Sequence, residues 1–295
     1  MRIVSLLPSA TEILFGIGAG NEVVGVTHEC DYPSEALHLP KLTAACGPAL
    51  TAPAEIDRHV RQSVHAGSSL YQLDSALLER LQPDLIVTQE LCAVCAVLYD
   101  IVDTAAKRLR SCHPERSRRT RVVSLEPRSL DDVLSTISLL GEISGHKDGA
   151  EGLISQLKAR IAALPGTGQV RTLVLEWTDP PMSAGHWIPE PIELAGGSPV
   201  LSNPGENSRR LEWNAIAVEA PDAVIVAPCG FNLPQTHRAV AALDSIAEWR
   251  ALDAYRGGRV LALDGNAYLS RPGPRLVEAA EIIARWYTGG AEYAG

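Results

Sequence analysis

The chain is poor in aromatic residues and in positive charge, and it has no long apolar run. Only 5% of its 295 residues are Phe, Trp or Tyr, which disfavours base-stacking platforms for nucleic acids. The formal charge of -9 at pH 7 argues against an extended nucleic-acid surface, so we expect no nucleic-acid partner. A run of about 18 apolar residues is also missing, and we therefore expect no membrane span.

Two signatures of enzymes are absent as well. The sequence contains no Gly-x-x-x-x-Gly-Lys-Ser/Thr motif, which excludes a P-loop NTPase, and no Gly-x-Ser-x-Gly nucleophile elbow. No pair of nucleophile and base stands out either. We therefore expect a protein that binds without turnover rather than an enzyme.

The amino terminus does not have the pattern of a secretory signal. Pro8 and then Glu12 interrupt the apolar run 3–7 before any small-residue cleavage site. We expect the mature protein to begin at residue 1 and to be cytoplasmic, where cysteine thiols stay reduced. The alternative is a periplasmic protein whose start site has been misassigned, which an upstream in-frame signal sequence would support.

The order of apolar runs and helical patterns predicts an α/β fold with parallel sheets. Residues 3–7 and 22–27 have the pattern of strands, and a capping box at Ser9 and Glu12 opens a helix between them. Two strands joined by a helix within about thirty residues favour parallel pairing. Further strands are expected at 85–88, 122–125, 172–176, 223–227 and 259–263, and further helices at 73–81, 98–109, 191–195, 213–218 and 274–287.

A helical stretch separates two halves of similar plan. Pro-Asp precedes a strand at 83–84 and again at 221–222, which suggests two lobes. An apolar stripe predicts a helix from about 147 to 164, roughly 27 Å long at about 1.5 Å per residue. We expect an amino-terminal lobe at 1–145, a bridging helix at 146–165 and a carboxy-terminal lobe at 166–295.

One segment is strongly basic. Residues 107–121 include seven Lys and Arg residues and few apolar ones. We expect a solvated, mobile loop at about 110–121. An anion or nucleic-acid patch is the alternative.

Two loops bring soft metal ligands to strand ends. His28 and Cys30 follow the strand 22–27, and Cys92 and Cys95 follow the strand 85–88. The carboxyl ends of parallel strands face the ligand crevice of an open α/β sheet, so we expect these four side chains to form a Cys3His site for zinc or iron. The alternatives are separate buried thiols with a capping histidine, a redox dithiol, or an axial ligand to corrinoid cobalt or haem iron.

Other residues near strand ends are candidate ligand contacts. Trp177 and Trp187 are suited to stacking on a flat macrocycle, with core packing as the alternative. The remaining candidates are Asp31, Tyr32, Glu90, Glu126, His186, Asn232, Asn266, Tyr268 and Arg271. For the turn residues among them, a purely structural role is the alternative.

Four stretches resemble the vitamin B12-binding proteins of bacterial ABC importers, and more broadly the helical-backbone solute-binding proteins for metal chelates. They are residues 2–18 (RIVSLLPSATEILFGIG), 24–33 (VGVTHECDYP), 81–87 (LQPDLIV) and 271–279 (RPGPRLVEA), in the same order. The resemblance implies two Rossmann-like lobes joined by a long interdomain helix. It also implies little domain closure, with cobalamin, another corrinoid or tetrapyrrole, or a related metal chelate in the cleft between the lobes.

The sequence departs from that family in three ways. It shows no signal peptide, and its His-x-Cys and Cys-x-x-Cys are not part of the family pattern. The glutamates with which each lobe of the family docks on the ABC permease are replaced near Ala76 and Asn214. We therefore expect a cytoplasmic relative that keeps the binding cleft and has lost or changed its permease partner. A metal-binding protein or metalloenzyme using the Cys3His site is the alternative.

Overall fold

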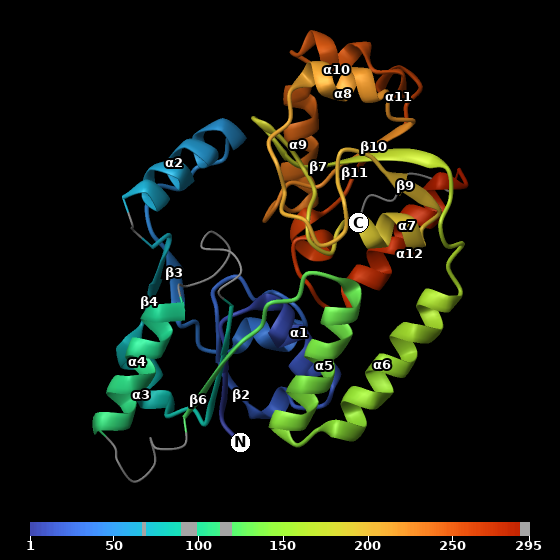
Figure 1. The fold of residues 1–295 in the computed structure, drawn as a ribbon. Helices are drawn as coiled ribbons and strands as arrows, with labels where there is room; N and C mark the ends of the chain where they lie inside the picture. Colours follow the sequence, from blue (N-terminus) through green and yellow to red (C-terminus); the bar gives the residue numbers. More distant parts are fainter. Residues whose placement is uncertain (67–68, 90–98, 113–119, 290–295) are drawn as a thin grey trace. The chain divides into compact units, whose positions relative to one another are not determined.

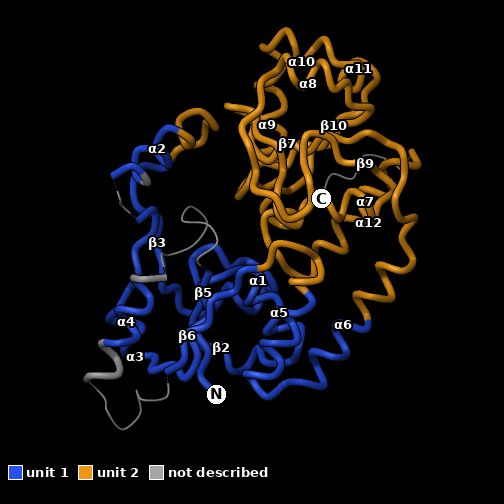
Figure 2. The backbone as a smooth tube through the Cα atoms, viewed as in Figure 1, with its two compact units in different colours: residues 1–49, 58–126, 134–155 blue, residues 50–57, 127–133, 156–295 orange. Residues whose placement is uncertain are grey.

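The structure is a computed structural model and describes residues 1–66, 69–89, 99–112 and 120–289 (Figure 1). The chain forms two compact units, which Figure 2 shows in different colours. Unit 1 comprises residues 1–49, 58–126 and 134–155, and unit 2 comprises residues 50–57, 127–133 and 156–295. Each unit has its own sheet with parallel strands, which confirms the predicted α/β class.

Unit 1 contains a four-stranded parallel sheet in the order β2-β1-β5-β6. The strands are β1 (Ile3–Ser5), β2 (Val23–Val26), β5 (Leu85–Thr88) and β6 (Arg121–Ser124). Every residue of β1 and β5 is buried, as expected of strands that helices cover on both faces. The helices of this unit are α1 (Pro8–Gly16), α3 (Ser75–Leu81) and α4 (Tyr99–Cys112), with 3-10 turns at Gly20–Glu22 and Ser34–His38.

A two-stranded antiparallel ribbon adds to unit 1 beside β2. It consists of β3 (Thr43–Ala45) and β4 (Tyr71–Leu73). The segment before β3 runs along β2, because the Val26 N–H donates to the Pro40 carbonyl at 2.9 Å and the Leu42 N–H donates to the Val26 carbonyl at 2.8 Å. These bonds place the start of β3 next to the loop that follows β2.

Helices cover both faces of the unit 1 sheet. Figure 1 shows α3 and α4 on one side of it and α1 on the other. Leu78 of α3 and Val102 of α4 pack with Val4 and Ile86 of the sheet in one buried apolar cluster. Burial of apolar side chains of this kind is the main stabilising contribution to such a unit.

Three helices contain residues of both units: α2 (Pro53–His65), α5 (Leu130–Ser144) and α6 (Lys147–Ala162). Residues 147–155 of α6 belong to unit 1, where Gly149 lies so close to α1 that a Cβ on it would be 2.1 Å from the Ile17 carbonyl oxygen. The rest of α6 belongs to unit 2, where Arg160 donates to both carboxylate oxygens of Glu281 at 2.8 Å.

Unit 2 contains a five-stranded sheet in the order β11-β10-β7-β8, with β9 also paired to β7. Its strands are β7 (Val170–Thr178), β8 (Pro181–Ser183), β9 (Gly197–Pro199), β10 (Ala223–Val226) and β11 (Val260–Ala262), and only β8 runs antiparallel to its neighbour. Its helices are α7 (Pro189–Leu194), α8 (Trp213–Glu219), α9 (Leu233–Leu243), α10 (Ala247–Ala251), α11 (Asp253–Arg256) and α12 (Arg275–Tyr287), and a π-helical turn spans Gly265–Leu269. Trp249 lies fully buried between this sheet and its helices.

Several details of the predicted elements need correction. The capping box at Ser9 is wrong, because α1 already begins at Pro8 and no side chain caps it. The basic segment is only partly a loop: α4 continues to Cys112 and Arg121 is the first residue of β6, while residues 113–119 lie outside the described residues. Within the described part of the chain, no helix is long and apolar enough to cross a membrane.

Candidate functional site

In unit 1, the carboxyl ends of the parallel strands present polar side chains. His28 follows β2, Gln89 follows β5 and Glu126 follows β6. Gln89 is buried, His28 is half-buried and Glu126 is exposed. The Ser124 hydroxyl donates to the Glu126 carboxylate, so that this side chain lies back along its own strand end.

His28 has the most constrained surroundings of these residues. Its backbone N–H donates to the Thr43 hydroxyl oxygen at 2.9 Å, and its Nδ1 lies 2.7 Å from the same oxygen. Thr43 in turn lies 2.7 Å from the Thr27 hydroxyl. The imidazole also contacts the ring of Tyr71, with centroids 5.5 Å apart, and the Tyr71 hydroxyl donates to Glu29 at 3.2 Å. The ring of His28 is therefore held in one orientation by β3 and β4.

Burial lowers the pKa of His28 from its ordinary value. The Glu29 carboxylate raises that pKa and the Lys41 ammonium lowers it, but burial is the largest effect. Low-dielectric surroundings disfavour the charged imidazolium. His28 is therefore neutral at pH 7.

Cys30 points into the protein. Its side chain is 1% exposed, and its Sγ lies 3.1 Å from the Thr11 hydroxyl. The Lys41 ammonium donates to the Cys30 carbonyl oxygen at 2.9 Å, which fixes the backbone of the loop. Asp31 and Tyr32, the next two residues, are exposed.

In unit 2, Glu176 and Trp177 lie at the end of β7. The Glu176 carboxylate accepts hydrogen bonds from the Gly185 N–H at 3.2 Å and from the Ser208 hydroxyl at 2.8 Å. The Trp177 ring meets Phe231 edge-on, with centroids 5.3 Å apart. Trp177 remains partly exposed, whereas Trp187 is 7% exposed and donates through Nε1 to the Leu269 carbonyl at 2.8 Å.

His186, a predicted ligand contact, lies in a cluster of polar side chains with Arg128 and Asn207 that the sequence did not predict. Its φ of 53° is left-handed, and its N–H donates to the Glu206 carbonyl at 2.6 Å. Burial lowers the pKa of His186, nearby Arg128 lowers it further, and a hydrogen bond with the Asn207 side chain raises it. Arg128 itself donates to Asn207 at 3.3 Å. Arg128 and Asn207 are 79 residues apart along the chain, so no spacing motif could have linked them.

Comparison with known proteins identifies the group to which this fold belongs. The periplasmic binding protein family matches residues 3–267. This chain belongs to the periplasmic binding protein family. The match confirms the superfamily resemblance that its sequence suggested.

Individual relatives of this periplasmic binding protein are distant but cover most of its length. The vitamin B12-binding protein of Vibrio cholerae is 22% identical over 97% of this chain and 88% of its own length. An uncharacterized ABC transporter substrate-binding lipoprotein of Bacillus subtilis is 24% identical over 96% of this chain and 78% of its own.

Solved structures share the fold. The periplasmic heme-binding protein RhuT of Roseiflexus sp. RS-1 superimposes with a TM-score of 0.68 at 23% identity, covering 99% of each chain. The periplasmic vitamin B12-binding protein of Vibrio cholerae gives a TM-score of 0.62 at 20% identity, covering 98% of this chain and 97% of its own.

The predicted metal site of this periplasmic binding protein stays a prediction. Cys92 and Cys95 lie outside the described residues, as does the candidate contact Glu90. Within the described residues, no three His, Cys, Asp or Glu side chains are grouped so that they could hold a metal ion. His28 and Cys30 each contact a different threonine, which gives both side chains a structural role without a metal.

Several predicted contact residues in unit 2 have structural partners. The Asn232 side chain accepts a hydrogen bond from the Gln235 N–H and caps α9. Asn266 accepts a hydrogen bond from Arg271 at 3.0 Å, and Arg271 is only 5% exposed. The Tyr268 ring lies 5.8 Å from the Arg275 guanidinium. These bonds order the loops after β10 and β11, and ligand contact by these residues remains a prediction.

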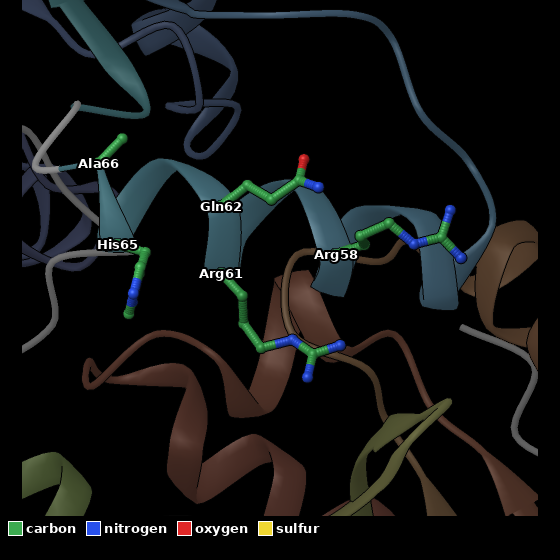
Figure 3. Close-up of a pocket in the computed structure, with 5 residues that line it drawn as sticks. All are labelled: Arg58, Arg61, Gln62, His65 and Ala66. Carbon is green, nitrogen blue, oxygen red and sulfur yellow. The ribbon is translucent and has the colours of Figure 1, made fainter.

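A hollow of about 460 Å³ lies along α2 (Figure 3). Arg58, Arg61, Gln62, His65 and Ala66 line it. In Figure 3, Arg61 and His65 point to the same side of the helix. One helix and the residue that follows it supply this lining, whereas ligand pockets have apolar walls with convergent polar groups. The residues that line this hollow therefore do not support a ligand site there.

Proposed function

We propose that this protein is the solute-binding component of an ABC importer and that its ligand is a corrinoid such as cobalamin or a haem-like tetrapyrrole. The observation that carries the proposal is the match to proteins named for vitamin B12 binding over 97% of this chain. Structural neighbours named for heme binding extend the ligand class to other flat tetrapyrroles. Binding without turnover is the activity that this family membership favours.

The strand ends of each unit supply suitable contacts for such a ligand. Unit 1 offers Asp31, Tyr32 and His28, and unit 2 offers Trp177 and His186, all of them at least partly exposed. An aromatic ring is suited to the face of a macrocycle, and imidazole and carboxylate groups are suited to its polar edge. We propose these side chains as candidate ligand contacts.

Isothermal titration with cyanocobalamin, cobinamide, haem and ferric chelates tests this function. We expect saturable binding of one corrinoid or porphyrin, and about three- to tenfold weaker binding after Trp177→Ala because a stacking contact is lost. The control is Val218→Ala, because Val218 is 86% exposed on α8 and its loss should leave affinity unchanged. Failure of the wild-type protein to bind any of these compounds would overturn the proposal.

We propose an ABC permease as the protein partner, in keeping with the family. Ala76 and Asn214, near the expected docking positions, are both exposed but are not themselves carboxylates, whereas Glu79 and Glu212 close by in the sequence are exposed glutamates. The names of the relatives favour the periplasm or a lipid anchor, and they give the predicted cytoplasmic location no support. Osmotic-shock fractionation of cells expressing the native gene distinguishes the two compartments: release with the periplasmic contents excludes the cytoplasm.

A further inference from the structure

The hydroxyl group of Thr43 meets three hydrogen-bonding neighbours at once. They are the His28 backbone nitrogen at 2.9 Å, the His28 Nδ1 at 2.7 Å and the Thr27 hydroxyl oxygen at 2.7 Å. A threonine hydroxyl has one proton to donate and two lone pairs with which to accept. The backbone N–H of His28 is a donor only, so it occupies one lone pair. Of the other two neighbours, one receives the Thr43 proton and one donates its own.

Two arrangements satisfy this rule. In the first, Thr27 donates to Thr43 and Thr43 donates to Nδ1 of His28, so every proton has an acceptor. In the second, Nδ1–H donates to Thr43, Thr43 donates to Thr27, and the Thr27 proton needs a further acceptor. Thr27 is 6% exposed, and among the described residues its hydroxyl has no second hydrogen-bond partner. Buried hydroxyls are normally satisfied, which favours the first arrangement.

The first arrangement determines the state of the outer nitrogen of the ring. Because Nδ1 accepts, the proton of neutral His28 must lie on Nε2. Nε2 has no hydrogen-bond partner within the described part of the chain, and the contact with Tyr71 fixes the ring plane. The half-buried side chain therefore offers one oriented N–H donor at the carboxyl edge of the unit 1 sheet.

We propose that His28 is held as the Nε2–H tautomer by Thr43 and Thr27, and that this N–H donates a hydrogen bond to a peripheral oxygen of the ligand. The inference rests on the proposed function. The acceptor is a carbonyl or carboxylate oxygen, which a corrinoid carries as side-chain amides and a haem carries as propionates. A protonated Nε2 has no lone pair to coordinate a metal, so this role replaces the predicted metal ligation by His28.

The ring state is measured on the ligand-free protein. In protein labelled with 15N-histidine, we expect the His28 Nδ1 to resonate as a nitrogen with a lone pair and Nε2 as a protonated nitrogen at neutral pH. His28→Gln assigns the signals by removing them, and His65→Gln, a change on exposed α2, is the matched control. A protonated Nδ1 in the wild-type protein overturns the proposal without reference to any ligand.

Thr43 variants test what holds the tautomer. Thr43→Ser keeps the hydroxyl group and should keep the Nε2–H form. Thr43→Val removes it and should give a mixture of tautomers. If Thr43→Val does not fold, the spectra of the wild-type protein and of Thr43→Ser still show which tautomer His28 adopts. A mixture of the two tautomers in either of these proteins contradicts the proposal.

Binding of cyanocobalamin, haem and metal-free protoporphyrin IX tests the donor role. His28→Ala should weaken binding by about three- to tenfold, the usual effect of one lost hydrogen bond, and His28→Gln should recover part of it. The loss should be equal for haem and for the metal-free porphyrin. A loss confined to haem, with a changed haem absorbance spectrum, identifies metal ligation and overturns the proposal.

The probes also identify the acceptor. If His28→Ala weakens only the binding of cyanocobalamin, the acceptor is an amide carbonyl oxygen. If it weakens the binding of both porphyrins equally, the acceptor is a carboxylate oxygen. If the wild-type protein binds none of the three probes, the proposed function fails and the donor role to these ligands fails with it. The tautomer measurement then still reports the state of the ring separately.

Discussion

Asn232 is a residue whose position suggested one role and whose contacts give it another. It follows the strand β10, and this place predicted a ligand contact. In the structure its side chain accepts a hydrogen bond from the Gln235 N–H at 3.1 Å, and the Gln235 side chain returns a bond to the Asn232 N–H at 2.9 Å. This reciprocal capping box satisfies two backbone donors at the start of α9.

Substitution of Asn232 separates these two roles. Asn232→Ala should lower the free energy of unfolding by about 1 kcal/mol, because the cap is lost, whereas Asn232→Ser should nearly restore it. Urea denaturation measures both. Ligand affinity should be the same in the Asn232→Ser variant and the wild-type protein. A large loss of affinity in that variant would show that Asn232 contacts the ligand.

The lowered pKa of His186 predicts a dependence of stability on pH. Because burial holds its pKa below the ordinary value of 6.5, the unfolded chain takes up a proton at a higher pH than the folded protein does. The contribution of His186 to stability is therefore complete above about pH 6.5 and falls as the pH drops toward the lower pKa of the folded state.

His186→Asn provides the comparison, because asparagine tolerates the left-handed backbone at this position. Urea unfolding across this range should show a smaller loss of stability in acid for His186→Asn than for the wild-type protein. Parallel curves for the two proteins would show that His186 does not titrate differently on folding.

Strands are better predicted from this sequence than the roles of side chains are. The run 85–88 was predicted as a strand with the bounds that β5 has, because a short apolar run after Pro-Asp leaves little choice. Trp187 could not be assigned to the core from its sequence, since the acceptor of its indole N–H is the Leu269 carbonyl, 82 residues further along the chain. The relation of Thr43 to His28 was also invisible, because it depends on the pairing of a short ribbon.

At the scale of elements, the close approach of α6 to α1 depends on one small residue. A Cβ at Gly149 would lie 2.1 Å from the Ile17 carbonyl oxygen, which is much shorter than a van der Waals contact distance. Gly152, one turn further along the same exposed helix, has nothing within 4 Å of such a Cβ. The two glycines therefore differ only in what they face.

Alanine at these two positions gives opposite expected results. Gly149→Ala should lower the free energy of unfolding by about 1–3 kcal/mol, because α6 or α1 must move to admit the methyl group. Gly152→Ala should raise it by up to about 1 kcal/mol, because alanine favours the helix and nothing obstructs it. Thermal or urea unfolding measures both changes, and equal effects at the two positions would contradict the close approach.

Helices α2 and α9 are two elements that the predicted order of strands and helices does not contain. The start of α9 carries a clear signal, since Asn232 is followed by a proline in the first turn and by Gln235 at the capping-box position. The segment therefore begins a helix, whereas its place after β10 predicted a ligand-binding loop. Helix α2 is mostly polar, but Ile56, Val60 and Val64 recur at every fourth residue, so a helical spacing was present in the sequence here as well.

At the scale of the whole molecule, α6 passes from unit 1 to unit 2 as one continuous helix. It spans Lys147–Ala162 without a proline, and its two parts are held by Gly149 against α1 and by Arg160 against α12. A continuous hydrogen-bonded helix resists bending, so we expect ligand binding to leave the small-angle X-ray scattering profile nearly unchanged.

Insertion of two glycines after Ser155 provides the control, because it breaks the helix where the units divide. In small-angle X-ray scattering, the variant with the two inserted glycines should show a broader distribution of interatomic distances than the wild-type protein. A marked decrease in the radius of gyration of the wild-type protein on ligand addition would show hinge closure instead.

The pairing of β1 with β5 affects how this protein folds during its synthesis on the ribosome. Residues 3–5 pair with β2 on one side, but they find their second strand partner only at 85–87, and unit 1 also includes residues 134–155. About half of the polypeptide must therefore be synthesised before its first strand can be enclosed on both sides. Until then the nascent chain exposes an apolar strand edge, and its early survival depends on the speed of translation and on chaperones that shield such edges.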